Sequence, residues 1–261
     1  TPGRIGIESA TVRRLGAEAT VTGELAGLKH PTLSARIKAV QPLPELGVAG
    51  LRAGRATWDA EVKWDSSGYS AAGPLAAEGV EWRSAGFRLR GVNARGQASL
   101  NNGLLTLRQA AVSALGGQWT GSLELAAWKA LKLDGKVSSI SLASVLAAVP
   151  GTSLPWDGFV SGPVSLSADL SAAGLSAIVA QGRLTVAPAE DRMPAEGSVN
   201  VRYSQAGGTV ELEDSVIRLP ATWMRFSGVL GRSLTVSLST TDLSEAEAAA
   251  GLFIEDKHLL T

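Results

Sequence analysis

The chain has 261 residues, with 24 Lys plus Arg against 24 Asp plus Glu, so its formal net charge is zero, and it contains no cysteine. A neutral chain without a basic run argues against a nucleic-acid-binding protein, because such proteins gather cations against phosphates. The lack of cysteine excludes disulfides, thiol nucleophiles and Cys-ligated zinc. Although 45% of the residues are hydrophobic, the uninterrupted apolar runs are too short for a membrane-spanning helix.

The sequence begins at Thr1 rather than Met and ends at HLLT without a terminal feature. It contains no charged segment followed by an apolar stretch, which is the pattern of a signal peptide. We therefore expect a fragment of a longer protein, whose signal or membrane anchor lies outside these residues.

Alternation of apolar and polar residues recurs along almost the whole chain and predicts β-strands. In Gly117–Leu125, for example, the apolar side chains fall on one side and the polar ones on the other. Gly- and Asn-containing stretches at 66–68, 101–103 and 206–208 are typical of hairpin turns. We expect roughly 18 strands of about five to nine residues, which stacked at about 4.8 Å reach about 85 Å.

Two segments carry helix signals. Leu142–Val149 predicts one or two turns, which Pro150 ends because proline cannot continue a helix. In Ser244–Glu255, Ser244 and Glu247 have the spacing of a capping box ahead of an alanine run, and this predicts a second helix.

The strand pattern repeats at long range. Leu33, Leu133 and Leu234 each anchor an alternating strand that follows a polar-Gly start, and they lie 100 and 101 residues apart. Each strand ends in a short segment of Pro or Leu followed by small residues. The spacing predicts a repetitive β protein with approximate repeats at 1–50, 51–150 and 151–261, and repeated units favour an elongated shape.

Signs of catalysis are weak. His30 and His258 are interpreted as surface residues, and no catalytic triad, zinc spacing or phosphate loop is present. Asp59, Glu61 and Asp65 lie beside tryptophans, which is compatible with a glycosidase cleft. We favour the simpler interpretation, in which these residues lie on the solvent-exposed face of one strand. We expect that the protein is not an enzyme and binds no cofactor or metal.

The apolar sides of the strands are the candidate site. They either close on each other as the core of a sandwich or line an open trough, and alternation alone cannot distinguish the two. Seven tryptophans also allow a carbohydrate-binding module, although a tryptophan on an apolar strand face is more often packed. We expect small residues such as Gly121, Ala168 and Ala60 to leave room in a trough for a ligand.

The predicted apolar face contains seventeen residues, all large and hydrophobic. They are Trp58, Val62, Trp64, Trp119, Leu123, Leu125, Leu133, Val137, Val164, Leu166, Leu170, Val199, Val201, Val210, Leu212, Val236 and Leu238.

The segment Ala195–Ala248 resembles the AsmA-like and TamB-like proteins of diderm bacteria. Four strand patterns of that family have counterparts here, and they are Gly197–Tyr203, Gly208–Ile217, Arg225–Leu230 and Leu234–Leu243. The likeness extends over most of the chain from about Ala10 and is thinnest at Val48–Gly79. It is a pattern of strand starts and ends rather than a catalytic signature.

The resemblance implies an all-β, elongated, mostly antiparallel curved sheet, taco-like in section, with an apolar groove and one or two short helices. It implies a periplasmic protein of the cell envelope, anchored to the inner membrane by a segment not present here, that shields phospholipid acyl chains during transfer between inner and outer membranes. Its implied partners are these acyl chains and an outer-membrane β-barrel protein, and membrane contact falls to parts outside the fragment.

Two other functions remain as alternatives. One is a scaffold segment for outer-membrane protein assembly with a barrel partner, and the other is a carbohydrate-binding β module.

Overall fold

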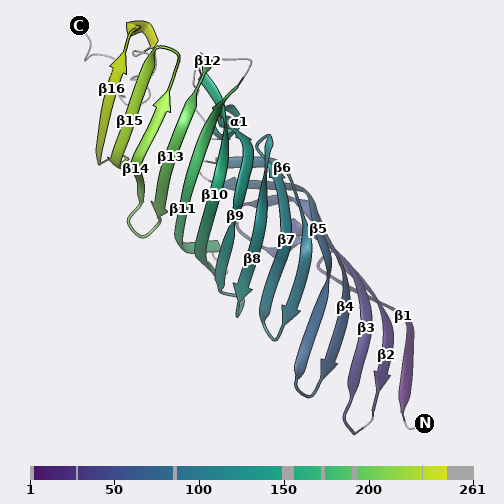
Figure 1. The fold of residues 1–261 in the computed structure, drawn as a ribbon. Helices are drawn as coiled ribbons and strands as arrows, with labels where there is room; N and C mark the ends of the chain where they lie inside the picture. The colour runs from purple at the N-terminus through teal and green to yellow at the C-terminus, as the bar shows by residue number, and fades with distance from the viewer. Residues whose placement is uncertain are drawn as a thin grey trace.

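The computed structural model describes residues 3–27, 29–84, 87–148, 156–171, 174–189, 193–230 and 232–245. These residues form one 16-stranded sheet in which each strand pairs with the next along the chain (Figure 1). The two-residue strand β12 is the exception and pairs in parallel with β10. All other pairs are antiparallel, and β1 and β16 form the two edges of an open sheet. The predicted all-β, elongated antiparallel architecture is therefore confirmed.

The strands and helices have the following bounds: β1 Arg4–Arg14, β2 Ala17–Ala26, β3 Thr32–Pro42, η1 Leu43–Leu46, β4 Leu51–Asp65, β5 Gly68–Ser84, β6 Phe87–Asn101, β7 Leu104–Ala114, β8 Gly117–Ala126, β9 Ala130–Ser141, α1 Leu142–Ala147, β10 Trp156–Ser171, β11 Gly174–Pro188, β12 Met193–Pro194, β13 Glu196–Ser204, β14 Thr209–Arg218, β15 Thr222–Val229 and β16 Ser233–Thr240.

The strands are longer and fewer than the sequence predicted. Apart from β12, they run from 8 residues in β16 to 17 residues in β5. Several of them contain a β-bulge, which inserts one extra residue and shifts the apolar–polar alternation by one position. The strand bends at the bulge and continues in the same sheet. At about 4.8 Å per strand the sheet is about 70 Å long rather than about 85 Å.

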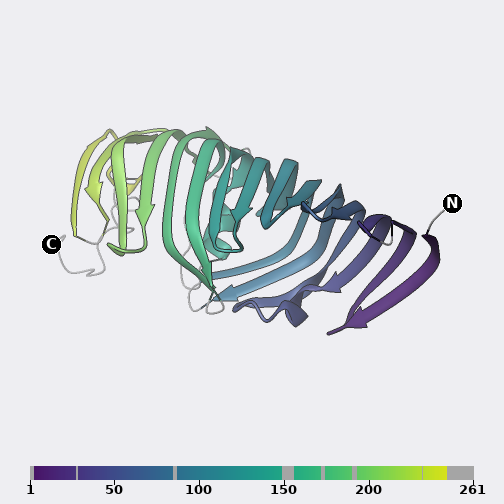
Figure 2. The same ribbon diagram turned by 90° about the horizontal axis from the view of Figure 1, so that it is seen from below.

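Four bulges hold a non-glycine residue in the left-handed backbone region. They are at Gln109 in β7, Ser139 in β9, Ala177 in β11 and Asp214 in β14. A bulge bends its strand and increases the local twist. The four strands run in the same direction, and Figure 2 shows the strands of this half of the sheet curved into an arch.

The predicted turns and the first helix are confirmed. Hairpin turns join β4 to β5, β6 to β7 and β13 to β14 at the three expected Gly- or Asn-containing stretches, where Asn102 and Gly103 both have positive φ. The helix α1 occupies most of Leu142–Val149. Of the helix predicted over Ser244–Glu255, the first two residues belong to a helical turn at 243–245, and the rest lies outside the described residues.

The sheet is a single layer, and its core is small. Among the described residues about half of the buried hydrophobic side chains are alanines, and the larger ones, apart from Leu125, gather in one cluster towards the C-terminal end of the sheet. That cluster contains Val160, Val186, Ala195, Ile217, Leu219, Met224 and Phe226. No second sheet lies over the first in the described ranges, so a closed sandwich core is not formed there.

The bulge at Ala177 gives a direct test of this curvature. Ala177 has a φ of 50°, which costs an L-residue about 1 kcal/mol or more and a glycine almost nothing. In Ala177→Gly and in the control Ala180→Gly, at an unbulged position of the same strand, the new glycine raises the backbone entropy lost on folding by the same amount. We expect the free energy of unfolding of Ala177→Gly to exceed that of Ala180→Gly by about 1 kcal/mol in urea titrations. An equal decrease in the free energy of unfolding of the two variants would contradict the bulge at Ala177.

Candidate functional site

Strand register defines the two faces of the sheet. Residues directly opposite each other in an antiparallel pair project to the same face. Pairs such as Leu33 with Trp64, Leu123 with Leu133 and Phe226 with Val236 can be followed from strand to strand across the sheet. They trace one face, here named the apolar face, from β1 to β16.

The register places all seventeen residues of the predicted set on this apolar face. They come from β4 (Trp58, Val62, Trp64), β8 (Trp119, Leu123, Leu125), β9 (Leu133, Val137), β10 (Val164, Leu166, Leu170), β13 (Val199, Val201), β14 (Val210, Leu212) and β16 (Val236, Leu238).

The apolar face carries almost no charge. Among the residues that the register pairs on it, Arg14 at the end of β1 is the one charged side chain. The ion pairs lie on the opposite, polar face, and they join Arg4 to Glu24, Arg13 to Glu18, Arg36 to Asp59 and Arg55 to Glu78. The two faces therefore differ sharply in chemistry along the length of the sheet.

The acidic residues of β4 belong to the polar face. Asp59 accepts two hydrogen bonds from Arg36 on β3, of 2.7 and 2.9 Å. This contact holds the pKa of Asp59 below its ordinary value, and the nearby charge of Lys38 lowers it further. Glu61 lies opposite Arg36 in the same register. The arrangement is that of a solvated strand face with cross-strand ion pairs.

Two tryptophans of the apolar face contact glycines. The indole Nε1 of Trp58 donates to the carbonyl oxygen of Gly73 at 3.2 Å. A Cβ atom built on Gly121 or Gly135 would lie 2.7 or 2.6 Å from the ring of Trp119. The expectation that Gly121 leaves room for a ligand is therefore wrong, because the Trp119 ring occupies that space.

Exposure on the apolar face differs between its C-terminal cluster, where Met224 and Phe226 are buried, and the rest of the sheet. Small side chains of this face are buried, among them Ala60 and Ala168, and the expectation that these two leave room for a ligand stays a prediction. The large side chains around them stay partly exposed, as Trp64 at 42%, Val236 at 38% and Leu238 at 41% show. A single-layer sheet explains this, because no second layer packs onto the large residues.

A pocket of about 240 Å³ indents the apolar face in its C-terminal half. Side chains from β10, β11, β13, β14 and β15 line it together with Leu142 of α1, and Ser215 is the one polar residue among them. The hydroxyl of Ser215 bonds to backbone atoms of Asn200 and Glu213. The lining of the pocket is therefore apolar, and its volume exceeds that of cavities that bind benzene.

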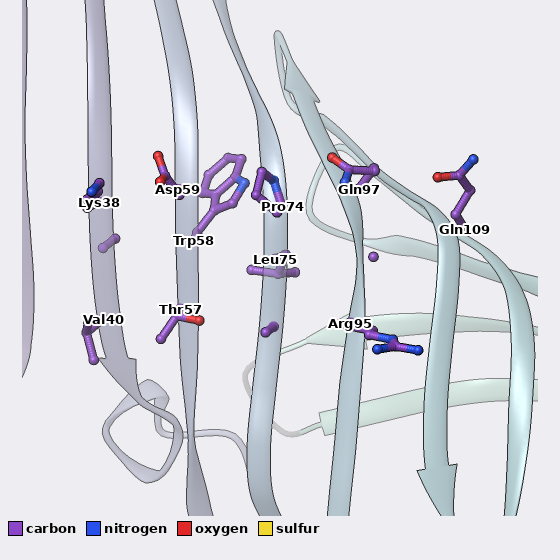
Figure 3. Close-up of a pocket in the computed structure, with 13 residues that line it drawn as sticks. Lys38, Val40, Thr57, Trp58, Asp59, Pro74, Leu75, Arg95, Gln97 and Gln109 are labelled. Atoms are coloured by element: carbon purple, nitrogen blue, oxygen red, sulfur yellow. The ribbon is translucent and has the colours of Figure 1, made fainter.

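A second hollow, of about 540 Å³, lies over β3 to β7. Figure 3 shows the ring of Trp58 beside Pro74, with Lys38 and Asp59 on one side of them and Gln97 on the other. Its lining mixes charged, amide and apolar groups. It does not have the uniform chemistry of the apolar face.

Sequence reasoning missed part of the apolar face. Met224 and Phe226 alternate within β15, and Leu105 and Leu107 within β7, so their periodicity could have identified them. Leu142 could not be assigned in this way, because it belongs to α1 and reaches the face only through the fold.

No known protein family, curated protein or solved structure matches this chain. The resemblance to the AsmA-like and TamB-like proteins therefore rests on residue patterns alone. Within the described ranges, no cluster of three or more acidic or histidine side chains could hold a metal ion. The helices found there lack the length and apolar character needed to cross a membrane.

The packing of Trp119 on glycines predicts a difference between two glycine positions. Gly135→Ala would place its Cβ against Thr120 O and the Trp119 ring, whereas a Cβ on Gly182 meets its neighbours at 3.4 Å, an ordinary contact. We expect Gly135→Ala to lower the free energy of unfolding by about 1–3 kcal/mol and Gly182→Ala to leave it unchanged or slightly raised. Similar losses in both variants, measured by denaturant titration, would argue against this packing.

The Arg36–Asp59 pair predicts an acid titration. Because the folded pKa of Asp59 is lowered, the pair's contribution to stability is present above the unfolded pKa of about 4 and is lost as the pH falls through the folded value. Carboxyl NMR should show the Asp59 pKa rising in Arg36→Gln and rising less in Lys38→Gln. An equal rise in the two variants would contradict the assignment of Arg36 as the main cause.

Proposed function

We propose that the apolar face shields lipid acyl chains from water and so carries phospholipid between membranes. The observation that supports this most directly is its combination of features: large apolar side chains, an almost complete lack of charge, and no covering layer in the described ranges. The setting we propose is the envelope of a diderm bacterium, between inner and outer membranes, and it rests on the resemblance of Ala195–Ala248 to envelope proteins.

The energetics of transfer fit such a surface. An acyl chain that leaves a bilayer loses about 0.8 kcal/mol for every CH₂ exposed to water. A chain that lies along the apolar face removes its CH₂ groups from water on the side that contacts the sheet.

The same surface allows movement. Charged or hydrogen-bonding groups would hold a headgroup at fixed points, and the apolar face offers Arg14 as its one charge among the paired residues. Headgroups would then remain in solvent beside the sheet while the chains slide. The dry pocket at Val160, Leu184 and Met224 provides a deeper position on this path.

The carbohydrate-binding alternative has less support. Sugar-binding sites use exposed aromatic rings as platforms. Trp119 is instead packed against Gly121 and Gly135, and the Nε1 of Trp58 is bonded to the carbonyl oxygen of Gly73. Trp64 is exposed, but it lies on the apolar face beside Leu33 and Val62, and Trp128 is exposed in the turn between β8 and β9.

The test compares a charge on the apolar face with the same charge on the polar face of the same strand. Leu166 lies on the apolar face of β10, and Ser167 lies on its polar face. We expect purified wild-type protein to carry phospholipid in native mass spectrometry and to transfer fluorescent phospholipid between vesicles. Leu166→Asp should lower the transfer rate by about 30- to 150-fold, because a charge in an apolar path costs about 2–3 kcal/mol, and Ser167→Asp should not.

A second variant guards against misfolding. Trp64→Glu changes the apolar face at a position that is 42% exposed, so it removes little burial, and circular dichroism checks the fold of every variant. Lipid-free wild-type protein, or full transfer by a folded Leu166→Asp, would overturn the proposal. A lipid-free protein would direct attention to the scaffold alternative.

A further inference from the structure

The polar face carries a hollow that the proposed function does not use. It is the hollow of about 540 Å³ over β3 to β7, here named the polar hollow. Two rows of cross-strand neighbours border it, and the register places both rows on the polar face. The first row is Lys38, Asp59, Pro74 and Gln97, and the second is Val40, Thr57, Ala76 and Arg95. The polar hollow therefore runs across the strands, over about 19 Å at about 4.8 Å per strand.

The middle of the polar hollow is low because β5 offers small side chains there. These are Pro74 and Ala76, whereas β4 and β6 on either side contribute polar side chains. At the far end, the bulge in β7 holds Gln109 at a φ of 50°, and a bulge re-aims the side chain that it carries. Figure 3 shows Gln109 at the level of Gln97, and the guanidinium of Arg95 reaching from β6 toward β7. The hollow therefore has an apolar floor with polar groups around it.

The polar hollow has an excess of positive charge in a chain that is neutral overall. Its charged lining residues are Lys38, Arg95 and Asp59. The charge of Asp59 is already balanced by Arg36, which donates two hydrogen bonds to its carboxylate. Neither Lys38 nor Arg95 forms an ion pair with another of the described residues. A ligand that carries a negative charge therefore complements this lining, and a guanidinium matches a carboxylate with two parallel hydrogen bonds.

The uncharged polar groups of the hollow both donate and accept hydrogen bonds. The side-chain amides of Gln97 and Gln109 are without a hydrogen-bond partner in the described part of the chain. Each amide has two donor hydrogens and one acceptor oxygen, and the hydroxyl of Thr57 both donates and accepts. The carboxylate of Asp59 keeps acceptor positions beyond the two that Arg36 uses. This mixed set suits a ligand whose own groups donate and accept, as hydroxyls do.

Two other classes of ligand match the polar hollow less well. Single-stranded nucleic acid stacks its bases on aromatic rings, and neither row contains an aromatic side chain, because Trp58 belongs to the apolar face. An extended peptide binds by adding a strand to a sheet edge, and β3 to β7 already pair on both sides. A sugar ring needs neither feature, since its C–H groups pack on Pro74 and on Val40, which is 39% exposed.

We propose that the polar hollow binds an acidic saccharide. A carboxylate of the saccharide lies against the guanidinium of Arg95, and its hydroxyls bond to the amides of Gln97 and Gln109. The site differs from the tryptophan-based carbohydrate-binding alternative, because it relies on charge and amides. It lies on the face opposite to the proposed lipid path and does not depend on that function.

The test is a titration of the wild-type chain with tetragalacturonate, which carries a carboxylate and hydroxyls on every ring. The side-chain amide NMR signals of Gln97 and Gln109 should shift and saturate. Maltotetraose has hydroxyls without charge and tetraglutamate has charge without hydroxyls, so each should bind at least about 10-fold more weakly. Equal binding of maltotetraose would remove the role of charge, and equal binding of tetraglutamate would remove the role of hydroxyls. Either result, or no shift with tetragalacturonate, would overturn the proposal.

Two matched arginine variants locate the site. Arg95→Gln removes a positive charge from the polar hollow. Arg183→Gln removes the same charge from an exposed position on the polar face of β11, opposite Asn200. We expect tetragalacturonate to bind about 10-fold more weakly to Arg95→Gln and with unchanged affinity to Arg183→Gln. Affinities that fall equally in the two variants, or in neither, would place the ligand elsewhere.

A third variant fills the hollow without changing its charge. Ala76 lies between Thr57 and Arg95 in the second row, so the ring of Ala76→Phe occupies the space of the saccharide. Binding should be lost while circular dichroism stays unchanged, and full binding by folded Ala76→Phe would count against the site. If this variant fails to fold, the arginine pair decides. Phospholipid transfer is a separate measurement, so the failure of either proposal leaves the other standing.

Discussion

The structure depends on one constraint: every strand must present its apolar side to the same face of a single-layer sheet. Because side chains alternate along a strand, a slip of one residue would turn a whole strand over. The register avoids this across every described antiparallel pair, and where the count of residues slips, a bulge absorbs the extra residue. Ala177 and Asp214 adopt positive φ at such bulges, so backbone strain is accepted to keep the face continuous.

The close packing of this face is local rather than global. The ring of Trp119 lies against Gly121 and Gly135, Trp58 donates a hydrogen bond to Gly73 O, and small buried alanines lie between the larger residues. The strongest cluster, around Met224 and Phe226, lies where α1 adds Leu142 to the sheet. Elsewhere, apart from Leu125, the large apolar side chains remain partly exposed. A sheet whose apolar side chains served only as a core would bury these large side chains. The proposed lipid path accounts for their exposure.

Much of this could be predicted from alternation. It identified the strand content and seventeen residues that share one face, because each strand carries its own period-two signal. The hairpin turns were predicted from Gly- and Asn-containing stretches, and α1 from a segment that ends before Pro150. Alternation could not supply strand length, since a bulge such as that at Gln109 resembles a break in the pattern. Nor could it show that Trp119 fills the space above Gly121, or that Leu142 reaches the face from a helix, because both are contacts between separate elements. Whether the face meets lipid is not encoded in periodicity at all.

The most direct measurement is photo-crosslinking with a phospholipid that carries a diazirine on its acyl chain, followed by peptide mapping of the labelled protein. The account predicts labels on apolar-face residues such as Trp64, Leu166 and Leu238, spread over several strands, with the polar-face neighbours Lys63, Ser167 and Ser237 unlabelled. Labels confined to the polar face, or no labelling of a well-folded protein, would contradict it.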